Sequence, residues 1–366
     1  MELADRAGRG AGLRTHNLRG ASALTELGSS LDDLLEDSAA PITFRRPWLE
    51  AWVAAFTDFE PWAIAVYDGP RLDGVALLGR RRRLGHTEIV PMGHGPSDAV
   101  RLPTRNKEGV EALATALVEA LAALRGPWRL VVGQIPAGDS VASRVANAWP
   151  DAELGPGDGS PALALGPGDT LEDHASTGYM KHVRRGWRLL ERLGDEVALT
   201  FVREADDVAR LLPELGEVRR RRDAALQRGA EPDQPEFARF LQVALVALAR
   251  RSEVEIAVLR VGGRCAGYAI CLVDGSAFRL WQTSFDPEWR DASPGRLILA
   301  ASVERVLAQG GFDQYDFMRG VYDWKMALAD TIVPSGRLLA WSSGRLRAAE
   351  GAARGLRARL RRGGTG

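Results

Sequence analysis

The sequence predicts an α+β protein of two similar units, each with a mixed, mostly antiparallel sheet flanked by helices. Its 366 residues suit two domains of about 100 to 200 residues each. A hydrophobic fraction of 45% and a charged fraction of 26% are typical of a globular chain. The order of helix-like and strand-like patterns in the first half returns in longer form in the second, which indicates a duplicated unit.

Changes in composition divide the chain. A segment at 150–173 is rich in Gly and Pro and is interpreted as a loop or connection between the units. The predicted divisions are a poorly ordered leader at 1–40, a first unit at 41–165, a second unit at 166–343 and an Arg-rich tail at 344–366.

The first unit shows helical spacing of apolar residues most clearly at 106–124. A β-branched run at 128–136 predicts a strand. The remaining predicted elements of this unit are an amphipathic helix within 41–56, strands at 62–69 and 72–85, a loop over 88–98 and a helix at 140–149.

The second unit opens with a basic helix at 178–195, and a three-stranded meander forms its centre. Gly-Gly and Asp-Gly at the ends of the first two strands of the meander favour tight hairpins. The predicted elements are a strand at 197–203, helices at 205–226 and 235–251, strands at 255–263, 264–275 and 276–286, a helix ending near Gln309, a strand at 312–320, a helical turn at 322–330 and a strand at 331–342.

Charge and composition exclude several classes of function. The 48 basic and 48 acidic residues balance, so no overall field attracts nucleic acid or membrane. No apolar run is long enough for a membrane span, and the N-terminus lacks a secretory signal, so a cytoplasmic protein is expected. Cys265 and Cys271 are too far apart along an extended strand for a disulfide. No Cys/His spacing indicates a metal, and the runs of four arginines at 80–83 and 219–222 are interpreted mainly as solvated faces.

Two features suggest chemistry. The motif Ser293-Pro294-Gly295 opens a helix, where unpaired N–H groups can hold an anion; Ser as N-cap and Pro at the first helical position would also explain it without a ligand. Lysine is rare, since only Lys107, Lys181 and Lys325 occur among the 48 basic residues. A lysine retained in an arginine-dominated chain suggests a need for a compact ammonium.

Several motifs together resemble the GNAT superfamily, and more closely its tandem-GNAT group, which includes the cellulose-biosynthesis-type acetyltransferases and is related to the Fem-type aminoacyl ligases. The resemblance covers about residues 41–340. The motifs that carry it are DPEWRDASPGRLIL at 286–299, YDFMRG at 315–320, YDWK at 322–325 and the basic MKHVRRGWRLLERLG at 180–194.

The resemblance implies an acyl-CoA donor held by a loop whose sequence motif in such enzymes is Arg/Gln-x-x-Gly-x-Gly/Ala. Ser293 stands here where the first Gly is usual. The implied donor-binding residues are Arg290, Ser293, Gly295, Arg296 and Leu297, with the N–H groups of the last three around a phosphate. The implied catalytic residues are Lys325, stabilising charge on the attacked carbonyl, and Asp316 and Tyr322, as proton acceptor or donor.

The implied substrate-binding residues are Lys181, Arg184, Arg185, Trp281 and Arg319. Each candidate also has a purely structural interpretation: a surface Lys325, a solvated basic helix around Lys181, a solvent-facing Asp316 on an alternating strand, and Trp281 as a core or cleft wall.

The expected function is therefore N-acyl transfer of the GNAT type, in which an amine, less readily a hydroxyl, attacks an acyl-CoA, with acetyl-CoA as the expected donor and no metal. The expected acceptor is a small molecule or a compound related to polysaccharide synthesis. Two alternatives stay open: a Fem-like ligase that uses aminoacyl-tRNA, and a catalytically inactive tandem-GNAT scaffold.

Overall fold

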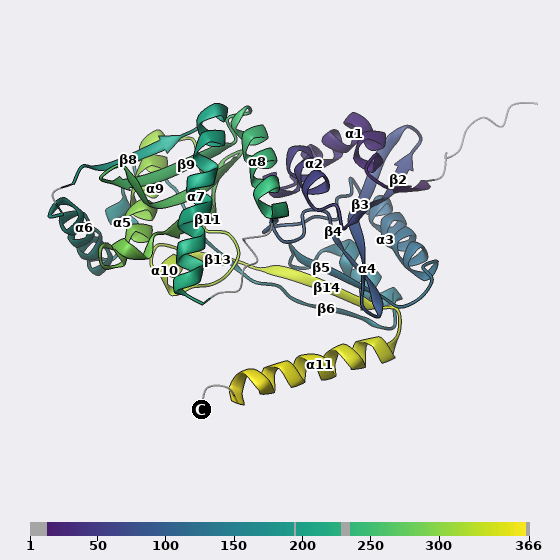
Figure 1. Cartoon of the computed structure of the whole chain (residues 1–366). Helices are drawn as coiled ribbons and strands as arrows, with labels where there is room; N and C mark the ends of the chain where they lie inside the picture. Colours follow the sequence, from purple (N-terminus) through teal and green to yellow (C-terminus); the bar gives the residue numbers. More distant parts are fainter. Residues whose placement is uncertain (1–12, 194, 228–234, 364–366) are drawn as a thin grey trace, which may run out of the picture.

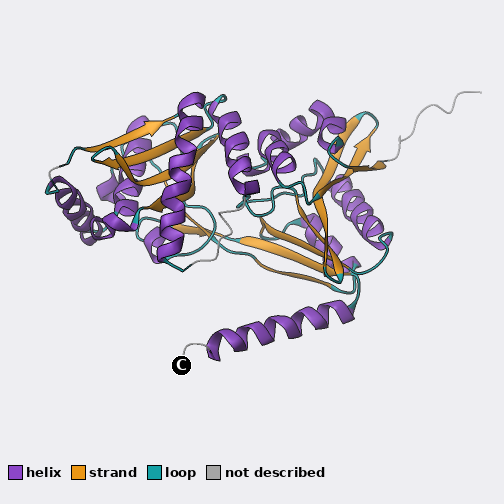
Figure 2. Ribbon diagram, viewed as in Figure 1, coloured by secondary structure: helices purple, strands orange, loops and turns teal. Residues whose placement is uncertain are grey.

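The chain folds into two units, each built on a seven-stranded mixed sheet with helices packed on it (Figures 1 and 2). This computed structural model describes residues 13–193, 195–227 and 235–363, with side chains described up to residue 353. The predicted α+β class and the two mixed, mostly antiparallel sheets are confirmed.

The first sheet runs through strands from both ends of the chain. Its order is β1 (Arg14–Arg19), β2 (Glu60–Asp68), β3 (Arg71–Arg83), β4 (His86–Pro91), β5 (Trp128–Pro136), β14 (Ser335–Trp341) and β6 (Ala152–Pro156). The helices of this unit are α1 (Ala23–Asp37), η1 (Ile42–Phe44), α2 (Arg46–Ala55), α3 (Lys107–Ala122) and α4 (Ser140–Ala148).

The second sheet repeats this arrangement. Its order is β8 (Val197–Val202), β9 (Val254–Val261), β10 (Arg264–Asp274), β11 (Ala277–Phe285), β12 (Gln314–Asp316), β7 (Ser160–Ala164) and β13 (Thr331–Val333). Its helices are α5 (Leu171–His174), α6 (Thr177–Glu191), α7 (Ala205–Ala225), α8 (Pro235–Ala249), η3 (Pro287–Ala292), α9 (Pro294–Gln309) and α10 (Asp323–Met326).

Both sheets pair their strands in the same way. In the spatial order of each sheet, neighbours among the first four strands pair antiparallel. The fourth and fifth strands pair parallel, and the fifth, sixth and seventh again pair antiparallel. The parallel pair is β4 with β5 in the first sheet and β11 with β12 in the second. The duplication inferred from element order is thus present in the strand topology.

The two repeats of the chain, β1–β7 and β8–β14, exchange their last strands between the sheets. After the edge strand β6 of the first sheet, the chain crosses into the second sheet as β7; after the edge strand β13 of the second sheet, it crosses back as β14. The predicted strand at 331–342 is therefore two strands in different sheets, divided at Pro334. The predicted connection at 150–173 contains β6, β7 and the short α5, so a boundary at 165/166 leaves β7 on the wrong side of its own sheet.

The leader predicted at 1–40 is wrong for its described part. Residues 14–19 form an edge strand, and α1 buries Leu24, Leu27, Leu31, Leu34 and Leu35. This spacing of three and four residues is helical, but Gly28 lies at φ 55° and interrupts the helix. Residues 1–12 lie outside the described part. Two further differences are that part of the predicted loop at 88–98 belongs to β4 and that the tail forms helix α11 (Gly344–Gly363).

A continuous apolar core joins the two units. Helix α2 of the first unit packs on α8 of the second, and Trp48 meets Phe240 and Trp281 edge to face, with ring centroids 4.9 and 5.0 Å apart. The indole of Trp281 donates to the carbonyl of Pro96 at 2.9 Å. Edge-to-face aromatic pairs stabilise beyond their buried area, so these contacts hold the units in a fixed relation.

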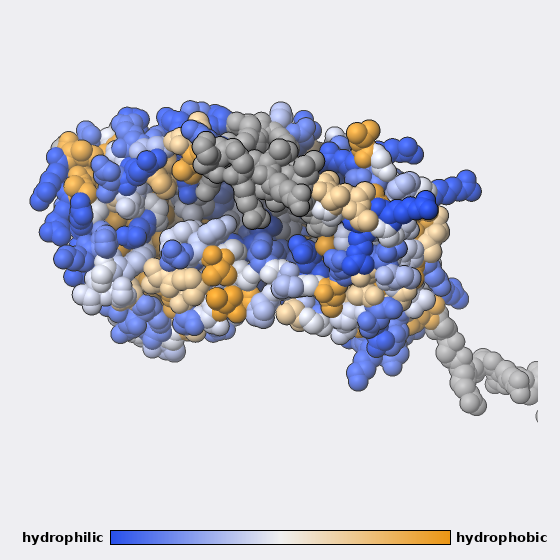
Figure 3. Space-filling view, turned by 90° about the horizontal axis from the view of Figure 1, so that it is seen from below, coloured by the Kyte–Doolittle hydropathy of each residue, from blue (hydrophilic) through white to orange (hydrophobic). Residues whose placement is uncertain are grey.

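Other expectations concern the surface and the thiols. Cys265 and Cys271 are both buried and free. No described helix combines the length and apolarity that a bilayer crossing needs. The face in Figure 3 is largely hydrophilic, with scattered hydrophobic patches.

Candidate active site

The loop before α9 holds an unusual backbone conformation. Ser293 lies at φ 54° and ψ 57°, in the left-handed region, and its side chain forms no capping bond to α9. Residues with a Cβ rarely adopt this conformation, whereas glycine does so without strain. The geometry explains why glycine is usual at this place in such loops, and it does not support the simple capping interpretation of the motif.

The first turn of α9 offers fewer free donors than the sequence suggested. Pro294 has no N–H, and the N–H groups of Arg296 and Leu297 both point at the carbonyl of Ser293, at 2.9 and 3.3 Å. The N–H of Gly295 is the first-turn donor that no described acceptor occupies. A ligand phosphate at this loop would therefore rely on that one N–H and on arginine side chains.

A cavity of about 300 Å³ lies against this loop. The parallel pairing of β11 with β12 ends at Arg279 and Asp316, so the later part of β11 is free to form the cavity's wall. The lining residues come from α6, α7, β11, η3, α9 and α10 and from Ser293 between η3 and α9: Tyr179, Arg222, Thr283, Phe285, Arg290, Ser293, Gly295, Arg296, Leu299 and Trp324. We call this space the loop cavity.

Helix α6 approaches the loop closely. A Cβ on Gly186 would lie 2.5 Å from the carbonyl oxygen of Ala292, so only glycine permits this contact. Tyr179 of the same helix is buried, and its hydroxyl lies 3.5 Å from the carbonyl of Arg296. The predicted basic residues Lys181, Arg184 and Arg185 are exposed on α6, at the end of the second unit farthest from the first (Figure 1).

Lys325 is buried, with 5% of the residue exposed. Its ammonium donates to the carbonyl oxygens of Met318 at 3.0 Å and Arg319 at 2.6 Å. Burial lowers the pKa of Lys325 to about 8, while the carboxylates of Asp98 and Asp316 act in the opposite direction. An ammonium has three N–H donors, so one is left for another acceptor. The interpretation of Lys325 as a surface residue is wrong.

Asp316 is also buried, but its charge is already satisfied. One oxygen accepts from the guanidinium of Arg279, and the other accepts from the N–H of Met318 at 2.7 Å. Arg279 also pairs with Asp274 at 2.7 Å. These contacts leave Asp316 poorly suited to accept a proton and well suited to hold the 316–319 segment in place. Tyr322 is 57% exposed.

Asp98 was missed by the sequence analysis. It comes from the loop after β4 in the first unit and pairs with Arg319 of the second unit, with Nε and Oδ1 3.2 Å apart. Its side chain is 13% exposed, and burial raises the pKa of Asp98 to about 6, against the opposing effects of Arg319 and Lys325. A carboxylate that titrates near neutral pH and lies between two units is a candidate proton acceptor.

A larger cavity of about 610 Å³ lies between the units. Arg319 contributes to its wall from the second unit. The other lining residues are Phe56, Thr57, Asp58, Phe59, Arg81, Arg83, His94, Gly95, Pro96, Arg219, Glu236 and Phe237. We call it the inter-unit cavity. Trp281 does not line either cavity, because it packs into the aromatic contact between the units.

Residues 178–326 match the family model of the acetyltransferase (GNAT) domain. The matched segment therefore begins in α6, contains the loop cavity and ends just after Lys325. No curated protein matches the chain.

Solved structures similar to the whole chain share its fold. FemX has a TM-score of 0.59 at 12% identity, covering 84% of this chain and 95% of its own. A conserved protein of unknown function from Bacteroides thetaiotaomicron has 0.54 at 13%, covering 85% and 97%. The C-terminal domain of a putative lysylphosphatidylglycerol synthetase from Agrobacterium fabrum has 0.52 at 15%, covering 87% and 94%. At such identities the likeness concerns the fold alone.

Within the described residues, no three His, Cys, Asp or Glu side chains gather in a way that could hold a metal ion. The segment that matches this family model thus offers a cavity beside an arginine-bearing loop and a buried ammonium, and the first unit supplies a carboxylate beside it.

Proposed function

We propose that the protein is an N-acyltransferase that moves an acyl group, with acetyl as the expected case, from an acyl-CoA to an amine. The observation that carries the proposal is the loop cavity inside the matched segment, with Arg290 and Arg296 at its rim. Arginine guanidinium groups can donate paired hydrogen bonds to the phosphates of the donor. The part of β11 that pairs with β10 but not with β12 leaves space for the thioester arm of the donor.

The acceptor is assigned to the inter-unit cavity. The segment from Met318 to Lys325 connects the two cavities, because Arg319 lines one and Trp324 the other. An amine in the inter-unit cavity would therefore approach a thioester in the loop cavity across this segment. Holding both reactants in this way would supply much of the rate.

Asp98 is proposed as the general base. The amine nitrogen bonds to the thioester carbonyl carbon and gives its proton to the Asp98 carboxylate; the carbon–sulfur bond then breaks and the thiolate leaves, taking a proton from water or from the exposed Tyr322. The fixed charge of Lys325 would lower the energy of the carbonyl oxyanion. Asp316 would position the segment that carries Lys325 through its bonds to Arg279 and Met318.

Donor binding can be tested by thermal shift with acetyl-CoA, longer acyl-CoA esters and total tRNA. A ligand at 100 times its Kd stabilises the folded state by about 2.7 kcal/mol, so the true donor should raise the unfolding midpoint clearly. Arg296→Gln should remove the shift, and Arg210→Gln, on the exposed surface of α7, should keep it. Absence of a shift with every CoA ester would reject the proposal.

Once an acceptor is found, Asp98→Asn should lower kcat by about 10² or more, the contribution typical of a general base. In the unmodified protein kcat/KM should rise with pH through about 6, since the base must be deprotonated. An unchanged rate in Asp98→Asn would assign the proton to another group.

The Fem-like ligase stays as a second candidate because the fold of FemX covers 84% of this chain. A stabilising, salt-sensitive interaction with tRNA and none with CoA esters would favour it. A chain that binds no donor but retains a stable partner would instead support the scaffold alternative, and a polysaccharide-related acceptor would support the cellulose-biosynthesis type.

A further inference from the structure

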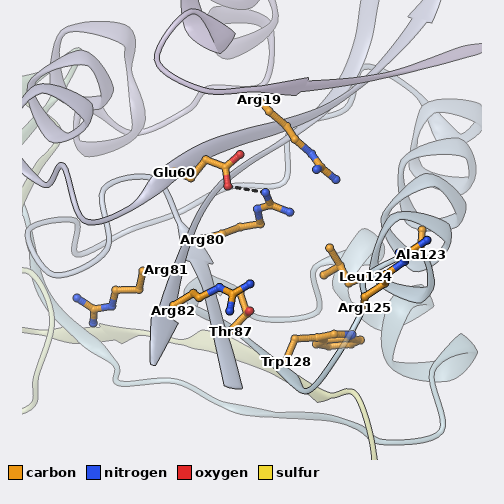
Figure 4. Close-up of a pocket in the computed structure, with 10 residues that line it drawn as sticks. All are labelled: Arg19, Glu60, Arg80, Arg81, Arg82, Thr87, Ala123, Leu124, Arg125 and Trp128. Atoms are coloured by element: carbon orange, nitrogen blue, oxygen red, sulfur yellow. Dashed lines mark hydrogen bonds and ion pairs between the residues drawn. The ribbon is translucent and has the colours of Figure 1, made fainter. Parts of the chain in front are cut away.

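We propose that the first unit carries a separate binding site for a small compound with two or more phosphate groups. The site is a cavity of about 410 Å³ at one end of the first sheet. Its lining comes from β1 to β5 and the C-terminal end of α3: Arg19, Glu60, Arg80, Arg81, Arg82, Thr87, Ala123, Leu124, Arg125 and Trp128 (Figure 4). We call it the arginine cavity.

The cavity gathers arginines from separate parts of the chain. Arg19 ends β1, Arg80 and Arg82 lie near the end of β3, and Arg125 follows α3. Because alternate residues of a strand face the same side, Arg80 and Arg82 point the same way, whereas Arg81 points away from them (Figure 4). The sequence analysis interpreted the run of four arginines at 80–83 mainly as a solvated face, whereas the structure directs Arg80 and Arg82 to the cavity.

Most of this charge has no carboxylate partner. Arg80 pairs with Glu60 at 2.5 Å, and Arg81 pairs outside the cavity with Asp58 and Glu88. Among the described residues, no carboxylate forms an ion pair with Arg19, Arg82 or Arg125, whose residues are exposed. The buried Nε of Arg80 also has no acceptor within the described structure.

The arginines that line the inter-unit cavity all have carboxylate partners. In the inter-unit cavity, Arg319 pairs with Asp98, and Arg83 pairs with Glu88 at 3.3 Å. Like charges that converge on one space repel one another unless an anion lies between them. Glu60 is the one carboxylate in the described lining and pairs with Arg80, so the charge of Arg19, Arg82 and Arg125 points to an anion that comes from outside.

The chemistry of the lining favours clustered phosphates. Guanidinium groups bind phosphate oxygens in pairs, and Thr87 adds a hydroxyl donor. Trp128 is only 2% exposed, so its ring offers no face for stacking a base, and the arginines surround one space instead of forming a stripe along the surface. These features fit a compact polyphosphate group better than a nucleic-acid strand.

The test is calorimetric titration of the full chain with sodium triphosphate at low salt. We expect binding that weakens at high salt because added ions screen the charges. Arg82→Gln and Arg125→Gln should each weaken binding by about tenfold or more, as loss of a charge-assisted hydrogen bond does. Both residues are exposed, so neither change should disturb folding.

Two matched variants locate the site. Arg83→Gln removes a neighbouring arginine that does not line the cavity, and Arg210→Gln removes an exposed arginine of α7 in the second unit. Both should bind triphosphate like the unmodified protein. No binding at low salt, or binding that Arg82→Gln and Arg125→Gln leave unchanged, would overturn the proposal.

A parallel titration with total tRNA separates the two sources of phosphate. If tRNA binds in a way that requires Arg82 and Arg125, and triphosphate does not bind, the site belongs to a nucleic acid. That result would also overturn the proposal. Because the readout is the part of the binding that requires Arg82 and Arg125 of the first unit, its failure and the failure of the acyltransferase proposal are distinguishable.

Discussion

Asp98 lies beside one arginine, yet burial has the larger effect on its pKa. The pKa of its carboxyl rises from 3.8 to about 6 in the folded protein. The folded state then binds more protons than the unfolded state between pH 4 and 6, so the free energy of unfolding must fall as pH rises through this range. A shift of this size corresponds to about 3 kcal/mol.

Asp98→Asn should remove that slope from the stability profile measured by urea unfolding between pH 4 and 7. Asp58→Asn is the matched control, because Asp58 also pairs with an arginine at the inter-unit cavity but is largely exposed. Exposed ion pairs contribute little, so this control should keep the slope. A slope that persists in Asp98→Asn would show that other groups titrate there.

Ser293 should be replaceable by glycine with a gain in stability. Its left-handed φ of 54° costs a residue with a Cβ about 1 to 2 kcal/mol, partly offset by the greater chain entropy of glycine. We expect Ser293→Gly to raise the free energy of unfolding by up to about 1 kcal/mol, measured by urea titration.

Ser143 of α4 is the matched control, because its backbone is helical and not left-handed like that of Ser293. Ser143→Gly should lower the free energy of unfolding by about 1 kcal/mol or less, because glycine disfavours a helix. If both substitutions destabilise, the strain at Ser293 is not relieved by glycine and the loop is held by other contacts.

Sequence reasoning reached some of these residues and not others. Lys325 was singled out because lysine is rare, and it is buried, with its ammonium bonded to the carbonyl of Met318. Asp98 had no local signal: it lies in a Gly- and Pro-rich loop, and its partners Arg319 and Lys325 are far along the chain. Only the tertiary arrangement brings these three charges together.

At the scale of elements, the crossing between the sheets leaves little space. A Cβ on Gly157 would lie 3.0 Å from the carbonyl oxygen of Gly336 and would collide with the hydroxyl of Ser335. That hydroxyl is fixed by bonds to Gln134 and to the carbonyl of Asp158, both at 2.8 Å. The two linking segments therefore pass each other in a contact that tolerates no added atom.

Gly157→Ala should lower the free energy of unfolding by about 1 to 3 kcal/mol, the usual cost of overpacking. Gly155→Ala, two residues earlier in β6, should change it little because its Cβ would meet no atom within 4 Å. Urea unfolding of both variants checks the difference. Equal stability of the two would mean that the crossing can widen at low cost.

The exchange itself could not be read from local patterns. Alternation and helical spacing identified most strands and helices, and the predicted order of the second unit from 178 to 330 is confirmed. The segment 331–342 was predicted as one strand, but Pro334 divides it between two sheets. Which sheet a strand joins depends on partners distant in sequence, and periodicity carries no information about them.

At the scale of the molecule, two features tie the units together. One core cluster contains residues of the first sheet, of α7 and α8, and of β9 and β10 in the second sheet. In addition, Arg45 of the first unit pairs with Asp274 of the second at 2.7 Å, and Arg279 links Asp274 to Asp316. The same ionic chain therefore reaches from the interface to the candidate site.

These features predict one cooperative unfolding transition for the whole chain, although chains of this size often unfold domain by domain. The first sheet closes only with β14, which the chain delivers after it has passed through the whole second unit, and one apolar core cluster spans both units, so opening of one unit should destabilise the other. Scanning calorimetry should give one peak whose calorimetric and van't Hoff enthalpies agree. Two resolved peaks would show that each sheet survives the loss of its exchanged strand.

Trp281→Ala distinguishes the two causes of this coupling. It removes the aromatic contact between the units but leaves the exchanged strands in place, so the midpoint should fall while a single peak remains. Trp187→Ala, on the outer helix α6 and packed on the other core cluster, is the matched loss of an indole within one unit and should also keep a single peak. If Trp281→Ala alone splits the transition, the apolar interface couples the units and the strand exchange does not.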